Sequence, residues 1–340
     1  MPPSSAGWTV RRDTNDSFVL VNRLLTAGAA VSVVPETGDF FVPAAAGALL
    51  TRHAAELGVA ATAAAHAPDT ARRVSAARVA LWDRYGGSMP SGWTRWLLEQ
   101  YGFAFEVIFP PQIDAGKLRD RYDVIVLPSG AVPRPGAGAS DSSFDDAYAP
   151  RDPAPADLPE EFRGRMGRFS AERSVPALRE FLEAGGTIVT VGTSGNLAYH
   201  LKLPVRSALV EVSAERRERA LPNDKFYVPG SVLRVALDRA AGATRGLPAE
   251  VDVYFDENQV FRLAPEAVAR GLRPLAWFGG EAPLRSGWAW GQHYLKDGVV
   301  GFEAPVGSGR LLVFAPEITF RAQTHATFRL LFNALYATAP

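Results

Sequence analysis

Residues 79–127 read VALWDRYGGSMPSGWTRWLLEQYGFAFEVIFPPQIDAGKLRDRYDVIVL, and their pattern indicates which kind of fold the chain can form. Three short apolar runs lie at 79–82, 105–109 and 124–127, and the segments between them have the spacing of amphipathic helices. Short apolar runs that alternate with helices are typical of parallel strands buried under helices on both faces. The segment therefore predicts a doubly wound, mostly parallel α/β sheet.

The same alternation continues beyond this segment. Helices are expected at 92–101, 115–121, 174–184 and 324–336, a fourth buried strand at 187–191, and a hairpin at 299–314. All of these elements fit one sheet that is covered by helices.

By composition and pattern the chain divides into two regions. Residues 1–70 predict a small N-terminal α/β subdomain and residues 75–340 the larger α/β domain, with 64–77 as the best candidate for a linker. Within the larger domain, residues 130–160 are rich in Pro and Gly and predict a long loop. Residues 205–290 predict a β-rich insertion packed on the core.

Composition excludes several classes of function. The 340 residues include 36 Lys and Arg against 36 Asp and Glu, so the formal net charge is zero and nucleic acid is not an expected partner. The chain has no cysteine, which excludes disulfides, thiolate metal sites and a cysteine nucleophile. With 47% hydrophobic residues, the sequence predicts a globular protein with a sizeable core.

The first residues, MPPSSAG, lack the basic and apolar parts of a signal peptide, and no later apolar stretch is long enough to cross a bilayer. We therefore expect a soluble protein without an export signal or a membrane span. The absence of cysteine leaves the compartment open, because a secreted bacterial protein can also lack cysteine.

Several motifs together resemble one protein family. They are WDRYGGSMPSGWTRWLLEQ at 82–100, FYVPGS at 226–231, SGW at 286–288, FRAQTH at 320–325 and LFNALY at 331–336. These motifs are similar to the carboxy-terminal part of large bacterial zinc carboxypeptidase-like proteins, in which a carboxypeptidase A-like metallopeptidase domain comes first. The resemblance implies a class I glutamine amidotransferase-like, flavodoxin-like fold, without the peptidase domain.

The same resemblance implies a role for the chain. It implies a non-catalytic accessory domain that docks to a peptidase domain or presents a peptide substrate. Members of the resembled family are hydrolases that are often exported. No cofactor is expected for the part that this chain represents.

A zinc site is the first chemistry to test, because the family's metal motif is His-x-x-Glu with a more distant His. One match is present, formed by His53 and Glu56. Leu50, Ala54 and Leu57 place this match on an amphipathic helix, whereas the zinc ligands of the family come from loops at strand ends. A solvated helix face is the alternative interpretation, and no metal is expected.

A serine nucleophile is the second candidate chemistry. Amidotransferase-like enzymes carry their nucleophile on a tight turn between a strand and a helix, and the equivalent turn here is 191–196 with Ser194. Glu317 and His325 follow the last strand and are candidates for orienting partners. A non-catalytic turn that caps a helix is the alternative.

A ligand pocket at the carboxyl ends of the strands is the third candidate, because open α/β sheets bind ligands there. Polar residues directly after the predicted strands are Asp83, Arg84, Tyr85, Ser88, Ser129, Thr193, Ser194 and Arg321. They predict a pocket for a small molecule or a carbohydrate. The alternative is that Asp83, Arg84 and Arg321 form a structural ion-pair network that fixes the loops.

Tryptophans give a last signal. Trp93 and Trp96 are expected in the buried stripe of the helix at 92–101. Trp288 and Trp290 lie in a Gly-rich, loop-like segment and predict an exposed binding patch.

Overall fold

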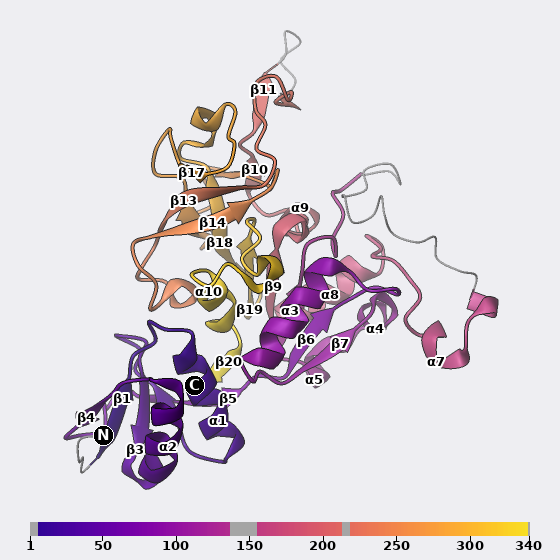
Figure 1. The fold of residues 1–340 in the computed structure, drawn as a ribbon. Coiled ribbons are helices and arrows are strands. Elements are labelled where there is room, and N and C mark those ends of the chain that lie inside the picture. Colours follow the sequence, from indigo (N-terminus) through magenta and orange to yellow (C-terminus); the bar gives the residue numbers. More distant parts are fainter. Residues whose placement is uncertain (1–5, 137–154, 213–217, 339–340) are drawn as a thin grey trace.

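A sheet of five parallel strands forms the centre of the molecule (Figure 1). The computed structural model describes residues 6–136, 155–212 and 218–338. The five strands are β6 (Val79–Trp82), β7 (Phe105–Ile108), β8 (Val124–Leu127), β9 (Thr187–Val191) and β19 (Gly309–Phe314). Their order is β7-β6-β8-β9-β19, and every neighbouring pair is parallel. Counted along the chain, this is the flavodoxin-like order 2-1-3-4-5.

Helices cover both faces of this sheet. They are α3 (Met89–Gln100), α4 (Pro110–Asp114), α5 (Leu118–Arg121) and α8 (Ser174–Glu183). β7 lies on one side of β6 and β8 on the other, so the chain reverses its direction across the sheet after β7. Right-handed connections therefore put α3 on one face of the sheet and the other three helices on the opposite face. In agreement, α4 and α5 both contact α8, and Figure 1 shows α3 in front of β6. The predicted doubly wound α/β fold is confirmed.

Two helices differ from their prediction. The helix expected at 115–121 is replaced by α4 and α5, because Gly116 and Lys117 take left-handed backbone conformations with φ of 71° and 52°. The helix expected at 324–336 is reduced to α10 (Phe328–Phe332). The residues after α10 form a strand instead, β20 (Tyr336–Thr338), because they pair with a distant part of the chain.

The β-rich region extends the central sheet. Its strands are β10 (Val205–Ser207), β13 (Ser231–Leu237), β14 (Glu250–Phe255), β15 (Phe261–Leu263), β16 (Arg273–Trp277), β17 (Leu284–Ser286) and β18 (Val299–Val306). β18 pairs antiparallel with β19 on one side and with β16 on the other, which joins both regions into one sheet. The β-rich region predicted at 205–290 is present, and it joins the core by strand pairing at the edge of the central sheet. Only β11 (Val210–Val212) and β12 (Glu218–Ala220) form a separate hairpin.

A second sheet lies at the N-terminal end of the molecule (Figure 1). Across this sheet the order is β20, β5 (Arg72–Ala76), β2 (Ser32–Val33), β3 (Phe40–Pro43), β1 (Gly7–Val10) and β4 (Ala61–Ala64), accompanied by α1 (Asp16–Thr26) and α2 (Gly47–Leu57). The predicted N-terminal α/β unit is present, but its boundary at residue 70 and the linker at 64–77 are wrong. β5 belongs to this sheet, and so does the C-terminal strand β20.

Short helical turns complete the described structure. They are η1 (Ala44–Ala46), η2 (Pro155–Asp157), α7 (Glu160–Arg163), η3 (Gly192–Asn196), α9 (Leu197–His200), η4 (Gly242–Thr244), η5 (Gln292–Leu295) and η6 (Phe320–Ala322). Most of the loop predicted at 130–160 lies outside the described residues.

An aromatic cluster joins the second sheet to the central one. The Phe332 ring on α10 lies 5.3 Å from Phe18 on α1, 4.7 Å from Tyr101 and 5.0 Å from Phe103, between ring centroids. Tyr336 stacks on Phe18 at 6.1 Å, and its buried hydroxyl donates a hydrogen bond to Asn22 Oδ1 at 2.9 Å. Residues from both ends of the chain therefore share one core.

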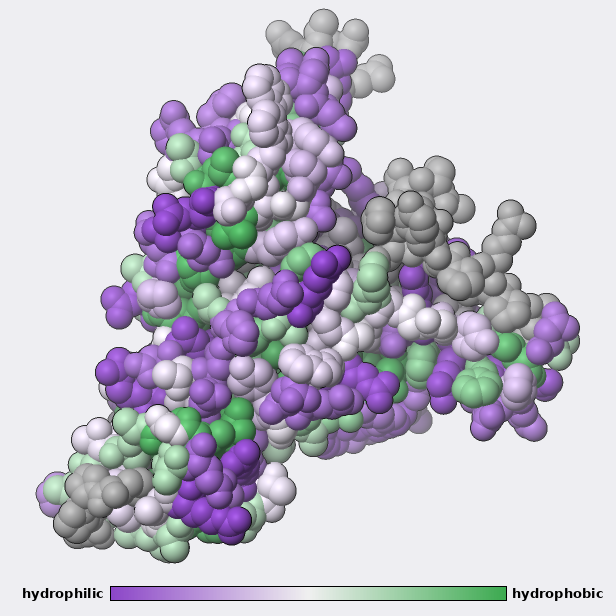
Figure 2. Space-filling model, in the orientation of Figure 1, coloured by the Kyte–Doolittle hydropathy of each residue, from purple (hydrophilic) through white to green (hydrophobic). Residues whose placement is uncertain are grey.

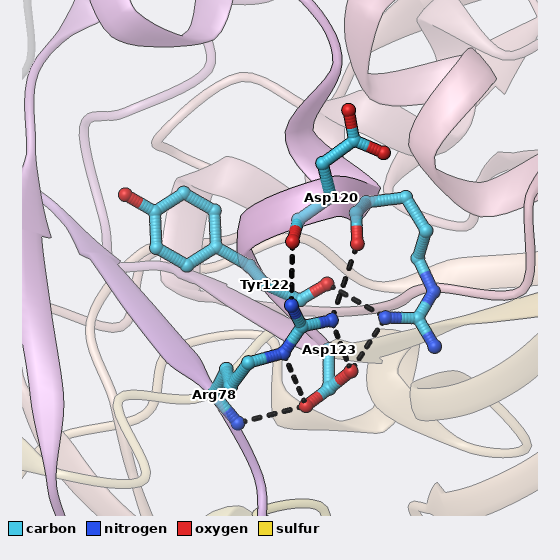
Figure 3. A network of polar contacts seen from close by, with 5 residues as sticks. Arg78, Asp120, Tyr122 and Asp123 are labelled. Carbon is cyan, nitrogen blue, oxygen red and sulfur yellow. Dashed lines mark hydrogen bonds and ion pairs between the residues drawn. The ribbon is translucent and has the colours of Figure 1, made fainter.

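A polar network fixes the amino-terminal ends of β6 and β8 (Figure 3). Arg78 donates from Nε and Nη2 to the two carboxylate oxygens of Asp123, at 3.1 and 2.9 Å, and from Nη1 to the Asp120 carbonyl at 2.6 Å. Arg119 donates to the same carboxylate at 2.5 Å. The hydrogen bonds from Arg78 hold the pKa of Asp123 far below its usual value, so this carboxylate is charged at neutral pH.

The visible face of the molecule is mostly hydrophilic, with hydrophobic residues in small separate patches (Figure 2). Among the helices described, none is both long and apolar enough to cross a bilayer.

Candidate functional site

The site to examine lies at the carboxyl edge of the parallel sheet. The strand order reverses between β6 and β8, and open α/β sheets bind ligands in the crevice at such a point. Asp83 follows β6, Ser129 follows β8, η3 follows β9 and Glu317 follows β19. The predicted residues at these four strand ends therefore share one edge of the sheet.

Ser194 on η3 is sealed inside the protein. Its side chain is fully buried, and its hydroxyl donates to the Pro128 carbonyl at 2.5 Å. The same oxygen accepts hydrogen bonds from the backbone amides of Ala131 and Val132, at 3.1 and 3.2 Å. A hydroxyl with three backbone partners and no exposed surface fastens the 128–132 loop to η3.

Ser129 and Thr193 fix the other side of this turn. Their hydroxyl oxygens lie 3.1 Å apart, and Thr193 Oγ1 accepts from the Gly130 amide at 2.8 Å. Gly192 has φ of 60°, and a Cβ added there would lie 2.1 Å from Glu317 Oε1 and 2.5 Å from Ser129 Oγ. Only glycine lets the buried Glu317 carboxylate approach the turn so closely.

Asp83 organises the loop that enters α3. Its Oδ1 accepts hydrogen bonds from the amides of Arg84 and Ser88, at 2.8 and 3.0 Å. Ser88 in turn caps α3 by accepting from the Ser91 amide at 3.3 Å. Burial nevertheless raises the pKa of Asp83, because removing the carboxylate from water outweighs these hydrogen bonds.

We expect Asp83→Asn to become more stable than the wild-type protein as the pH rises, so that the difference between their free energies of unfolding grows with pH. A carboxyl group whose pKa is higher in the folded state binds protons more tightly there. Its contribution to the free energy of unfolding therefore falls once the pH exceeds about 4, where the group in the unfolded chain loses its proton. Asparagine keeps the acceptor oxygen and has no charge to desolvate. Urea unfolding of both proteins at pH 4 to 8 measures this difference in free energy of unfolding. A difference that stays constant with pH contradicts the prediction.

Arg321 does not join Asp83. Its guanidinium lies 5.2 Å from the centre of the Phe320 ring, and within the described residues it forms no ion pair with Asp83. Phe320 stacks on Tyr254 at 3.7 Å. Arg321 has φ of 47°, which is uncommon for a residue other than glycine. Aromatic contacts surround this turn, and within the described residues the predicted ion-pair network does not include Arg321. Arg84 donates from Nε to the Gly87 carbonyl at 3.1 Å, within the loop that also contains the partly buried Tyr85.

His325 lies apart from Ser194. Its exposed ring contacts Phe328, with 5.0 Å between ring centroids, and its carbonyl accepts a hydrogen bond from Asn15 Nδ2 at 2.9 Å. These partners belong to α10 and to the start of α1. Within the described residues the Ser194 hydroxyl bonds to the backbone of 128–132, so the structure does not assemble a triad of Ser194, His325 and Glu317.

His53 and Glu56 form part of a surface ion-pair cluster on α2. His53 Nδ1 lies 3.3 Å from Glu56 Oε2, which also accepts from Arg23 at 2.9 Å. Arg52 pairs with the other carboxylate oxygen at 3.2 Å. Two guanidinium groups already neutralise this carboxylate, and within the described ranges no three His, Asp or Glu residues form a group suited to a metal.

The structure agrees with the predicted exposure of two tryptophans and contradicts the predicted burial of a third. Trp288 and Trp290 are 60% and 53% exposed, which confirms the exposed segment. Trp96 is 51% exposed, so the prediction that it is buried is wrong. Leu97 and Leu98 fill the inner face of α3, which turns Trp96 toward solvent.

Sequence reasoning missed Gln259. Its Nε2 donates to Asn196 Oδ1 at 2.5 Å and to the Thr193 carbonyl at 3.3 Å, which ties η3 to the segment between β14 and β15. No sequence periodicity links residues 63 positions apart, so only the folded structure reveals this contact.

The fold and the site together define an α/β protein with a parallel core in flavodoxin-like order, an added antiparallel N-terminal sheet and a closed turn after β9. No family model and no curated protein matches the sequence. Among solved structures, the chain is similar to a ThuA-like protein from Parabacteroides merdae, with 11% identity over 76% of this chain and 89% of that one and a TM-score of 0.43.

Two further solved structures have the same kind of similarity. A glutamine amidotransferase from Thermotoga maritima is 14% identical over 74% of this chain and 80% of that one, with a TM-score of 0.40. A β-galactosidase from Bacillus circulans is 14% identical over 76% of this chain and 31% of that one, with a TM-score of 0.38. Identities this low describe the fold and say nothing about activity.

Proposed function

We propose that this chain is a non-catalytic accessory module of the kind found after the catalytic domain in zinc carboxypeptidase-like proteins, with docking or substrate presentation as its role. One observation carries the proposal. The residue at the nucleophile position, Ser194, is fully buried, and its hydroxyl is used to fasten a loop. A nucleophile must reach a substrate and a base, and this hydroxyl reaches neither.

The resemblance in the motif at 82–100 supports the same role. That segment forms the last residue of β6, the Asp83 loop and α3. These contacts hold a loop and a helix in place, so the segment has a structural role that does not require catalysis.

The absence of catalysis is tested with a serine-directed fluorophosphonate probe on the unaltered protein. We expect no covalent adduct at Ser194, and hydrolysis of p-nitrophenyl acetate, glutamine and a carboxypeptidase substrate at the rate of buffer, with and without added zinc. Labelling of Ser194, or zinc-dependent turnover in a preparation with stoichiometric zinc by mass spectrometry, contradicts the proposal.

Docking requires a separate test. A catalytic domain is purified from a zinc carboxypeptidase-like protein that contains both parts, and is mixed with this chain in sedimentation velocity. A complex heavier than either protein is the expected result. Two unchanged species across the concentration series count against docking.

A further inference from the structure

We propose that the cleft between β10, β15 and η5 binds an oxyanion, the carboxylate or phosphate group of a small molecule. The cleft has a volume of about 450 Å³, and its lining includes Arg206, Arg262, His293, Tyr294 and Lys296. β10 lies in the upper part of Figure 1, beside β11 and far from the N-terminal sheet. The inference is independent of the proposed accessory role, which does not use this cleft.

Two arginines on neighbouring strands lie side by side in the lining of the cleft. β10 and β15 are antiparallel, and Arg206 is directly opposite Arg262 in their register. Directly opposite residues lie on one face with Cβ atoms about 4.5–5.5 Å apart, where like charges are destabilising. Both arginines line the cleft, so an anion placed between them relieves this repulsion.

Among the described residues, only the Arg206 side chain of this pair has a charged partner. Arg206 Nη1 donates to Glu218 Oε1 at 3.1 Å. The Arg262 side chain is exposed, and within the described part of the chain it forms no hydrogen bond or ion pair. Its guanidinium retains five N–H donors in a planar fork, which matches the two oxygens of a carboxylate or phosphate.

The other wall of the cleft supplies further polar groups. η5 contributes His293 and Tyr294, whose rings lie 4.2 Å apart between centroids. Lys296 also lines the cleft and pairs with Glu281 at 2.8 Å. The lining contains the cations Arg206, Arg262 and Lys296 and the carboxylates of Glu218 and Asp297. Because Glu218 pairs with Arg206 and Glu281 pairs with Lys296, the Arg262 guanidinium is the cation of the described lining that remains available to attract an anion.

Isothermal titration calorimetry with inorganic phosphate and with acetate, at constant ionic strength, tests the proposal. We expect saturable one-to-one binding of at least one probe to the unaltered protein. Arg262→Gln is expected to weaken that binding at least tenfold. Arg262→Lys is expected to give an intermediate affinity, because an ammonium keeps the charge and loses the fork.

Arg285→Gln is the matched control. Arg285 is an arginine on β17 with a 51% exposed side chain, outside the lining of the cleft, and its replacement is expected to leave the affinity unchanged. The thermal midpoint of Arg262→Gln without ligand should equal or exceed that of the unaltered protein, because the substitution removes a like-charge pair.

Each outcome is decisive. Saturable binding of phosphate with weaker binding of acetate assigns the site to phosphate groups, and the reverse order assigns it to carboxylates. Heats that do not saturate with either probe overturn the proposal. An affinity that Arg262→Gln leaves unchanged also overturns it, because the anion then binds elsewhere.

Discussion

Phe332→Ala is expected to lower the free energy of unfolding by about 3–5 kcal/mol, the usual range for removing a fully buried phenylalanine. Phe332 is fully buried, and its ring contacts Phe18, Tyr101 and Phe103. These partners come from α1, from the end of α3 and from the segment before β7. The cavity left by alanine therefore lies where the two sheets meet, and neither side can close it without moving the other.

Guanidinium unfolding, followed by circular dichroism and by tryptophan fluorescence, measures this loss. Phe332→Leu should cost less, because it leaves a smaller cavity. Trp96→Ala removes a larger aromatic group that is 51% exposed and is expected to change stability by about 0.5 kcal/mol or less. A loss below about 1 kcal/mol for Phe332→Ala would show that the junction is loosely packed.

Ser194→Ala is expected to cost about 2–4 kcal/mol, although it deletes a single oxygen. The buried amides of Ala131 and Val132 lose their acceptor, and the Pro128 carbonyl loses its donor. Each buried polar group left without a partner costs about 1–3 kcal/mol, and partial relaxation of the loop reduces their sum. The substitution thus tests the structural use of Ser194 directly.

Hydrogen exchange at residues 131 and 132 gives the site-specific measurement. Both amides are expected to be protected in the unaltered protein and to exchange much faster in Ser194→Ala. Ser308→Ala, in the exposed turn between β18 and β19, is the control and should change neither stability nor this protection. Unchanged protection of both amides would contradict the role assigned to Ser194.

The central strands could be predicted because their signal is local. Runs such as 79–82 and 124–127 are apolar without interruption, and such a run is most stable as a strand that is buried on both faces of the sheet. α8 was predicted nearly to the residue, because it is amphipathic and ends before Gly185 and Gly186. Sequence pattern alone was therefore sufficient for the doubly wound core.

Weakly patterned elements could not be predicted in the same way. In β5 only Val74 is buried, so its sequence resembles that of a linker. Its partner β20 lies more than 250 residues away, at 336–338, and the sequence predicts its first residue, Tyr336, as the end of a helix. Pairing with β5 overrides this local preference, because it completes the N-terminal sheet.

The candidate site shows the same division between sequence and tertiary structure. By itself, the sequence determined that no thiol is available, that the core is a parallel sheet, and that Asp83, Ser129, Ser194 and Glu317 follow its strands at one edge. Only the tertiary structure decided that the Ser194 hydroxyl is enclosed by backbone and that His325 packs against Phe328. It also placed Arg206 opposite Arg262. Residue types and strand ends follow from short-range pattern, whereas enclosure and strand register depend on distant segments that meet only in the folded chain.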